Sequence, residues 1–127
     1  MFDKGDIDER YYYKQDAYMY KTLKKEIVSK NTVYQWRRVY VRENKSGECP
    51  TLTANMGTGG HNVPLIKDNL GIRKLTPREC LNFQGFPKNF NFPHDIPISQ
   101  KYKQAGNAVT VNLIKKIAII LKRILNK

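Results

Sequence analysis

Arginines and aromatic side chains are interleaved in the run between residues 32 and 42. Arg37, Arg38 and Arg42 stand near Trp36 and Tyr40, among β-branched residues. This composition predicts a strand. Three arginines on a strand usually form a solvated face, but a guanidinium beside an aromatic ring also presents planar donors to nucleic acid. Both interpretations stay open on the residues alone.

A glycine-rich stretch is the next chemically unusual feature. Three glycines lie within four residues, and two polar side chains follow them, in the order Gly57, Thr58, Gly59, Gly60, His61 and Asn62. Neither a Gly-Lys-Ser/Thr sequence nor a helical pattern follows, which excludes a phosphate loop and the dinucleotide fingerprint. A hairpin turn is the ordinary interpretation. The alternative is a recognition loop, because glycine lets backbone approach a ligand closely and His61 and Asn62 suit base edges or phosphates.

The charge of the chain points to an anionic partner. Its 127 residues hold 23 Lys and Arg against 11 Asp and Glu, which gives a net charge of +12. Residues 1–64 hold 11 basic and 8 acidic side chains (+3), whereas residues 65–127 hold 12 and 3 (+9). Most of the net positive charge therefore lies in the second half of the chain. The length suits one domain and excludes a multi-domain enzyme.

Composition also excludes several classes of protein. No apolar run approaches the roughly 18 residues of a membrane span, and the first residues lack the pattern of a secretory signal. We therefore expect a cytoplasmic location without membrane contact. Cys49 and Cys80 are too few and too far apart for a zinc site, so we expect two free, packing thiols and no metal.

The segment 6–30 is the first of the secondary-structure elements that we expect to support these residues. Apolar and aromatic groups recur there at three- and four-residue steps, at Tyr13, Ala17, Tyr20 and Leu23, which predicts a helix. Its tyrosines are expected to pack half-buried, and stacking on bases is the alternative.

Two further elements flank the middle of the chain. Residues 49–54 predict a short strand, which Pro50 confines to an edge or a strand start. Thr76, Pro77 and Glu79 match a capping box with proline at the first helical position, so a short helix should follow through 80–83. No periodic element is expected between its end and Pro97.

The C-terminal segment predicts two more helices. Ser99 should cap a short one over 100–105, which Gly106 ends. The last, over 109–125, is amphipathic, and its apolar side carries Leu113, Ile114, Ile117, Ala118, Ile120, Leu121, Ile124 and Leu125. Because the helix lacks aromatic anchors, we expect this stripe to pack against protein rather than on a membrane.

Two blocks resemble, in order and spacing, the last two conserved blocks of bacterial cytosine-5 DNA methyltransferases. The first is Arg73-Lys74-Leu75-Thr76-Pro77-Arg78-Glu79-Cys80, followed by Gln84-Gly85-Phe86-Pro87. The second is Tyr102-Lys103-Gln104-Ala105-Gly106-Asn107-Ala108-Val109. Upstream, residues 50–64 are similar to the target-recognition domain of the family, including its Thr-Leu pair. The resemblance runs from about Val33 to the C-terminus.

The resemblance implies which part of such an enzyme the chain supplies. Family members flip cytosine out of the duplex, attack it with the cysteine of a Pro-Cys block, and transfer methyl from S-adenosylmethionine bound by a Phe-x-Gly-x-Gly loop. Neither of these blocks, nor the family's Glu-Asn-Val block, occurs in the 127 residues, and Cys49 and Cys80 stand in other contexts. The resemblance thus implies the DNA-recognition and C-terminal portion or subunit of a DNA (cytosine-5-)-methyltransferase of the restriction-modification kind, with no catalytic residue and no activity alone.

The resemblance also implies binding residues. In the family the small domain faces the major groove, where arginine can bind guanine and glycine lets amides approach. The implied DNA contacts are Arg37, Arg38, Tyr40, Arg42, Thr51, Leu52, Thr53, Asn55, Gly57, Thr58, Gly59, Gly60, His61 and Asn62. Asn107 and Ala108, expected at the start of the last helix, would touch the methionine end of S-adenosylmethionine. Many relatives have Ser where Ala108 stands, so a hydroxyl contact is absent here.

We therefore predict an α+β chain with three parts. These are a helical lead-in over 1–31, a target-recognition domain of short irregular strands, loops and short helices over 32–98, and C-terminal helices over 99–127 that dock on a cofactor-binding domain missing from the chain. The expected partners are double-stranded DNA and a catalytic subunit or N-terminal portion that carries the Pro-Cys and Phe-x-Gly-x-Gly blocks. Two alternatives remain: a stand-alone sequence-specific DNA-binding module without catalysis, and a basic protein-interaction domain whose glycines are only turns.

Overall fold

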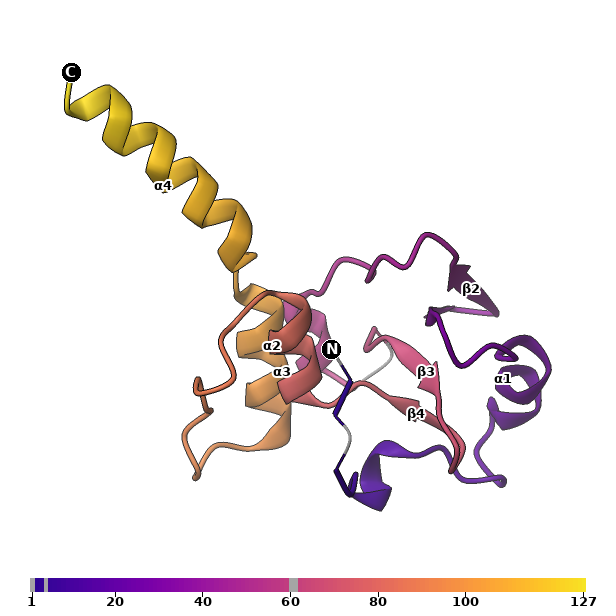
Figure 1. The fold of residues 1–127 in the computed structure, drawn as a ribbon. Coiled ribbons are helices and arrows are strands. Elements are labelled where there is room, and N and C mark those ends of the chain that lie inside the picture. Colours follow the sequence, from indigo (N-terminus) through magenta and orange to yellow (C-terminus); the bar gives the residue numbers. More distant parts are fainter. Residues whose placement is uncertain (1, 4, 60–61) are drawn as a thin grey trace.

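The computed structural model describes residues 2–3, 5–59 and 62–127, and its α+β class is the one predicted (Figure 1). Four antiparallel strands lie in the order β2-β1-β3-β4: β1 (Val33–Arg37), β2 (Tyr40–Asn44), β3 (Leu65–Lys67) and β4 (Ile72–Lys74). The helices are α1 (Tyr20–Glu26), α2 (Pro77–Phe83), α3 (Ile98–Asn107) and α4 (Val111–Leu125), with the 3-10 turns η1 (Glu9–Tyr11) and η2 (Ala54–Gly57).

The sheet separates two hydrophobic clusters, because successive residues of a strand point to opposite faces. Tyr34 and Leu65 face one side, where they pack with Leu23 of α1. Val33 and Ile66 face the other side and join the larger cluster, which also holds Leu52, Met56, Val63, Leu75, Cys80, Leu81, Tyr102 and Ala105. The larger cluster therefore fixes η2, α2 and α3 against one face of the sheet.

The run 32–42, predicted as one strand, is instead a hairpin. β1 and β2 pair antiparallel, and Gln35 lies opposite Arg42. The chain reverses at Arg38, whose φ is 58°, and at Val39, whose N–H donates to the Arg37 carbonyl at 2.6 Å. The prediction was wrong because this turn contains neither Gly nor Pro, the residues that usually mark a reversal.

Only a small part of the segment 6–30 is helical, so the predicted continuous helix was wrong. α1 and η1 are short, and between them the chain runs beside β4. Tyr12 forms an isolated bridge with Arg73, and the Tyr13 N–H donates to the Ile72 carbonyl at 2.9 Å. Main-chain hydrogen bonds to the free edge of β4 thus replace the helical ones that the residue spacing had indicated.

Residues 49–53 form no strand, contrary to the prediction, and lead into η2. Gly57 of η2 lies against α3, where an added Cβ would meet the Ser99 carbonyl oxygen and come within 3.1 Å of the Lys103 Cβ. Gly106 of α3 lies in turn against the backbone of η2, and an added Cβ there would be 2.6 Å from the Ala54 nitrogen. Residues 49–53 thus pair with no strand, and the turn η2 that follows them is held against α3.

The predicted capping box is confirmed at the start of α2. Thr76 accepts from the Glu79 N–H at 3.1 Å, the Glu79 carboxylate accepts from the Thr76 N–H at 2.8 Å, and Pro77 begins the helix. The same carboxylate accepts from both terminal nitrogens of Arg73, at 2.7 and 2.9 Å, while Arg73 Nε donates to Asp68 at 2.8 Å. Arg73 is 2% exposed and Glu79 0%. The block 73–80 therefore contains a buried ion network that joins β4 to α2.

The helix α3 is longer than predicted and changes the position of the last block. Pro97, not Ser99, is its N-cap, and Gly106 lies inside it rather than after it. Gly106 does not have the positive φ of a glycine that ends a helix, and its missing side chain allows close packing on η2 instead. Asn107 is the last residue of α3 and Ala108 its C-cap, so these residues do not begin the final helix as expected.

The helix α4 projects away from the rest of the chain (Figure 1). It is amphipathic as predicted, begins two residues later than expected, and has no buried residue. Its apolar side is about half exposed, with Leu113 at 53% and Ile117 at 44%. None of the helices in the described part of the chain is long and apolar enough to cross a bilayer.

Candidate functional site

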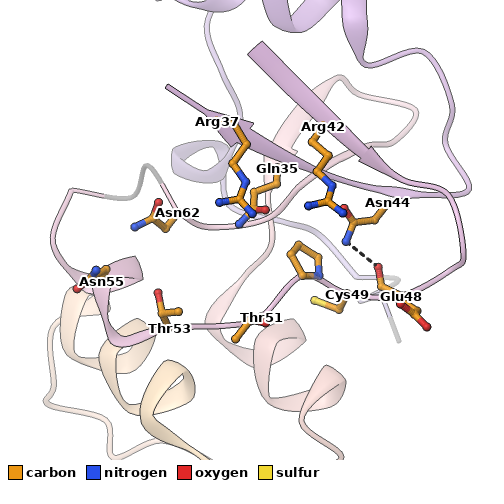
Figure 2. Close-up of a pocket in the computed structure, with 11 residues that line it drawn as sticks. Gln35, Arg37, Arg42, Asn44, Glu48, Cys49, Thr51, Thr53, Asn55 and Asn62 are labelled. Carbon is orange, nitrogen blue, oxygen red and sulfur yellow. Dashed lines mark hydrogen bonds between the residues drawn. The ribbon is translucent and has the colours of Figure 1, made fainter. Parts of the chain in front are cut away.

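One face of the β1–β2 hairpin carries a set of polar side chains. Their common direction follows from the register, because cross-strand partners and next-nearest neighbours on a strand share a face. The segment 48–55 runs opposite them, and the two walls bound a groove of about 450 Å³ (Figure 2). This polar groove is lined by Gln35, Arg37, Arg42, Asn44, Glu48, Cys49, Pro50, Thr51, Thr53, Asn55 and Asn62.

The polar groove is rich in hydrogen-bonding groups and net positive. Arg37 and Arg42 extend into it from the hairpin (Figure 2), and Glu48 is the one acidic residue in its described lining. Asn44 Nδ2 donates to the Glu48 carbonyl at 3.3 Å, while Asn44 Oδ1 is buried with no hydrogen-bond partner among the described residues. Guanidinium groups bind guanine or phosphate through paired hydrogen bonds, and side-chain amides pair with adenine. This lining therefore suits a base or a phosphate better than an apolar ligand.

The structure brings six of the fourteen predicted DNA contacts together in the polar groove. They come from three separate segments of the sequence, the hairpin, the 51–55 run and the end of the glycine stretch, and they are Arg37, Arg42, Thr51, Thr53, Asn55 and Asn62. The hairpin and the run that leads to η2 are thus parts of one surface.

Other residues that were predicted to contact DNA pack in the core, bond to the main chain or lie in a turn. Leu52 is 9% exposed and belongs to the larger core, and Gly57 packs on α3. Thr58 Oγ1 donates to the Asn55 carbonyl at 2.9 Å. Gly59 has a φ of 114°, which identifies it as a turn residue. Gly60 and His61 lie outside the described residues.

Arg38 and Tyr40 lie at the tip of the hairpin, outside the polar groove. Tyr40 is 57% exposed. Arg38 borders a separate depression of about 410 Å³, whose lining also includes Trp36, Tyr18, Met19 and Asn62. This depression therefore has the Arg38 guanidinium and the rings of Trp36 and Tyr18 in one lining, and it shares Asn62 with the polar groove.

Sequence reasoning missed five residues of the polar groove: Gln35, Asn44, Glu48, Cys49 and Pro50. Gln35 and Asn44 stand two positions from Arg37 and Arg42, on the same face of their strands. Recognition of the hairpin would have found both. Cys49 contributes its side chain to a wall, and burial raises the pKa of its thiol to about 12, which makes it a poor nucleophile.

A second depression, of about 400 Å³, lies where the linker between α3 and α4 meets α2. We call it the linker groove; it is lined by Cys49, Pro50, Thr51, Leu52, Phe83, Gln84, Ala108, Val109 and Thr110. Ala108, one of the two predicted cofactor contacts, is in this lining, whereas Asn107 is exposed at the end of α3. The segment 49–51 lines both grooves and so forms a wall between them.

Both cysteines of the described part of the chain are free thiols. Cys80 is fully buried in the core, and burial raises the pKa of its thiol. No three His, Cys, Asp or Glu side chains among the described residues are grouped as a metal site requires.

Comparison with known proteins relates the chain to methyltransferases. A family model of the C-5 cytosine-specific DNA methylases matches residues 3–123. The type II methyltransferase M.Bsp6I of Bacillus sp. (strain RFL6) is 60% identical over 113 residues, which cover 88% of this chain and 36% of that protein. The type II methyltransferase M1.ScrFI of Lactococcus lactis subsp. cremoris is 39% identical over 77 residues, 61% of this chain and 19% of that protein.

A relative that is named for a different substrate also matches. The tRNA (cytosine(38)-C(5))-methyltransferase of Mus musculus is 38% identical over 52 residues, 41% of this chain and 12% of that protein. The chain thus spans at most 36% of the length of each of these three relatives. No solved structure matches it.

Proposed function

Because the chain belongs to the C-5 cytosine-specific DNA methylase family, we propose that it supplies the DNA-recognition and C-terminal part of a DNA (cytosine-5-)-methyltransferase. The observation that carries the proposal is the polar groove, where Arg37 and Arg42 converge with amide and hydroxyl side chains. Such groups recognise base edges and phosphates. The net charge of +12 favours association with a polyanion.

The proposal assigns methyl transfer to a chain or portion that carries the Pro-Cys and Phe-x-Gly-x-Gly blocks. Those blocks are absent from these 127 residues, and both thiols that are present have raised pKa values. A thiol must ionise to attack cytosine, so neither Cys49 nor Cys80 suits that step. The uncovered apolar side of α4 supports a contact with the catalytic portion, since a stripe of this size favours burial.

The residues at the α3–α4 corner fit one edge of S-adenosylmethionine rather than a complete site. The lining of the linker groove is neutral, and it combines polar Gln84 and Thr110 with apolar Leu52 and Phe83. The exposed Asn107 amide can hydrogen-bond to an amino-acid end group. The cofactor supplies the methyl group when it is bound. Asn107 and Ala108 orient its methionine end, and the other portion provides most of the site.

A salt series on DNA binding tests the recognition part of the proposal. If the chain neutralises about six phosphates, the logarithm of its affinity for a fluorescent duplex should fall with the logarithm of salt concentration, with a slope near −5. A flat response would contradict DNA recognition and favour the protein-interaction alternative. Competition by a transfer RNA at equal nucleotide concentration identifies the preferred nucleic acid, and stronger binding of the RNA would contradict the DNA assignment.

A further inference from the structure

The side chain of Gln84, just after α2, is bound to the linker between α3 and α4. Gln84 Nε2 donates to the Ala108 carbonyl at 3.1 Å and to the Ala105 carbonyl at 3.4 Å. Gln84 Oε1 accepts from Thr110 Oγ1 at 2.9 Å, and the main-chain carbonyl of Gln84 accepts from the Val111 N–H at 2.8 Å. Gln84 is 9% exposed. One nearly buried residue thus contacts four groups on both sides of the linker.

These hydrogen bonds join Gln84 to groups at the end of α3 and the start of α4. The Ala105 carbonyl is among the last four carbonyls of α3, which lack partners within a helix, and the Val111 N–H is among the first four N–H groups of α4. Thr110 is the N-cap of α4, yet its side chain accepts no hydrogen bond from the helix. Its hydroxyl donates to Gln84 instead, so the start of α4 is held by α2 rather than by its own cap.

A second contact supports the same junction. Gly85 has a φ of 80°, and an added Cβ would lie 3.3 Å from Asn112 Nδ2 in the first turn of α4. The first turn of α4 therefore packs closely on the chain just after α2. No residue of α4 is buried beyond it. Gln84 and Gly85 thus both contact the start of α4.

We propose that Gln84 is a positioning residue that sets the direction of α4 and holds Ala108 at the wall of the linker groove. Its amide can do this because it donates to one side of the linker and accepts from the other, which neither a carboxylate nor an apolar side chain of similar length can do. The consequence for S-adenosylmethionine rests on the proposed function. The mechanical role of Gln84 does not.

Hydrogen exchange on the full chain tests the mechanical role. Gln84→Met keeps the side-chain length but removes its hydrogen bonds to the linker, and Gln100→Met makes the same change at an exposed position of α3. In Gln84→Met, the Ala108 and Val111 amides should exchange about tenfold faster, because the three side-chain hydrogen bonds of Gln84 are lost and each has a modest net strength, while the Cys80 amide inside α2 should keep its rate. Gln100→Met should change none of these rates.

Thr110→Val provides a milder test if Gln84→Met does not fold. It removes only the bond to Gln84 Oε1 and should accelerate exchange of the Val111 amide about threefold to fivefold. Unchanged exchange at Ala108 and Val111 in the folded variants would overturn the proposal. Equal acceleration throughout α2, α3 and α4 would also overturn it, because that result indicates general destabilisation.

A kinetic measurement tests the cofactor consequence in a mixture with the chain that carries the Pro-Cys block. Gln84→Met should raise KM for S-adenosylmethionine about tenfold, whereas KM for DNA should change less than about twofold. If the Ala108 and Val111 amides exchange faster while KM for S-adenosylmethionine is unchanged, only the proposed effect on the cofactor is overturned. If the wild-type mixture shows no methyl transfer, the proposed function fails, and the exchange rates still decide the role of Gln84.

Discussion

Gln35 and Arg42 are direct cross-strand partners, and both line the polar groove. An amide and a guanidinium side by side on a pleated surface can read adjacent base edges. We therefore predict that Arg42→Ala weakens binding to preferred DNA by about 1–3 kcal/mol and relaxes the preference at one base pair. Selection of bound duplexes from a randomised pool, compared for the two proteins, measures this effect.

The control for Arg42→Ala is Arg10→Ala, which removes an exposed guanidinium that pairs with Asp8 and is not part of the groove lining. It should leave sequence preference unchanged. Equal weakening of all sequences by Arg42→Ala, with a salt slope smaller by about 1, would show instead that Arg42 contacts a phosphate.

The buried pair Arg73–Glu79 should dominate the stability of the block that carries α2. Arg73→Met leaves a fully buried carboxylate without its main partner, so the free energy of unfolding should fall by about 3–5 kcal/mol. Arg10→Met breaks the exposed Arg10–Asp8 pair and should have no measurable effect. Urea unfolding of both variants makes the comparison, and similar losses would refute the structural role of the buried pair.

Asp68 should make stability depend on pH in the acidic range. Burial raises the pKa of this carboxyl, but hydrogen bonds from Tyr12, Arg73 and the main chain outweigh it, so its pKa lies below the ordinary 3.8. The unfolded chain then binds more protons than the folded one between the two values, and stability is lost as pH falls through this range. Asp68→Asn should reduce the stability difference between pH 5 and pH 3 in urea titrations. An unchanged difference would contradict this assignment.

Gly106 should be intolerant of even a methyl side chain. An added Cβ would collide with the backbone of Thr53 and Ala54, so Gly106→Ala should lower the free energy of unfolding by about 1–3 kcal/mol and separate α3 from η2. Gly5→Ala, at a position with no atom within 4 Å of the added Cβ, should change stability by less than about 0.5 kcal/mol. Comparable effects of the two substitutions on thermal unfolding would contradict the close packing.

Some elements could be predicted because their signals are local. The capping box of α2 is specified by Thr76, Pro77 and Glu79 within four positions, and the amphipathic pattern of α4 repeats over four turns. The α+β class followed from such signals. These elements depend little on distant residues, and the structure contains both.

Other elements depend on contacts that the sequence pattern does not display. Tyr13 has helical spacing with its neighbours but pairs with Ile72 along the edge of β4. Gly106 resembles a helix end, yet it is a packing site for η2. The polar groove could be predicted only in part, because Gln35 and Asn44 enter it through the pairing of two strands that were taken for one.

Methyl transfer in a reconstituted mixture shows whether this chain is the DNA-recognition part of a methyltransferase. Duplex DNA that contains the preferred sequence is incubated with radiolabelled S-adenosylmethionine and with this chain, with the chain that carries the Pro-Cys and Phe-x-Gly-x-Gly blocks, or with both. We expect label on cytosine only in the mixture, rising to a plateau at equal amounts of the two chains. Methyl transfer by this chain alone, or no association and no activity in the mixture, would contradict this expectation.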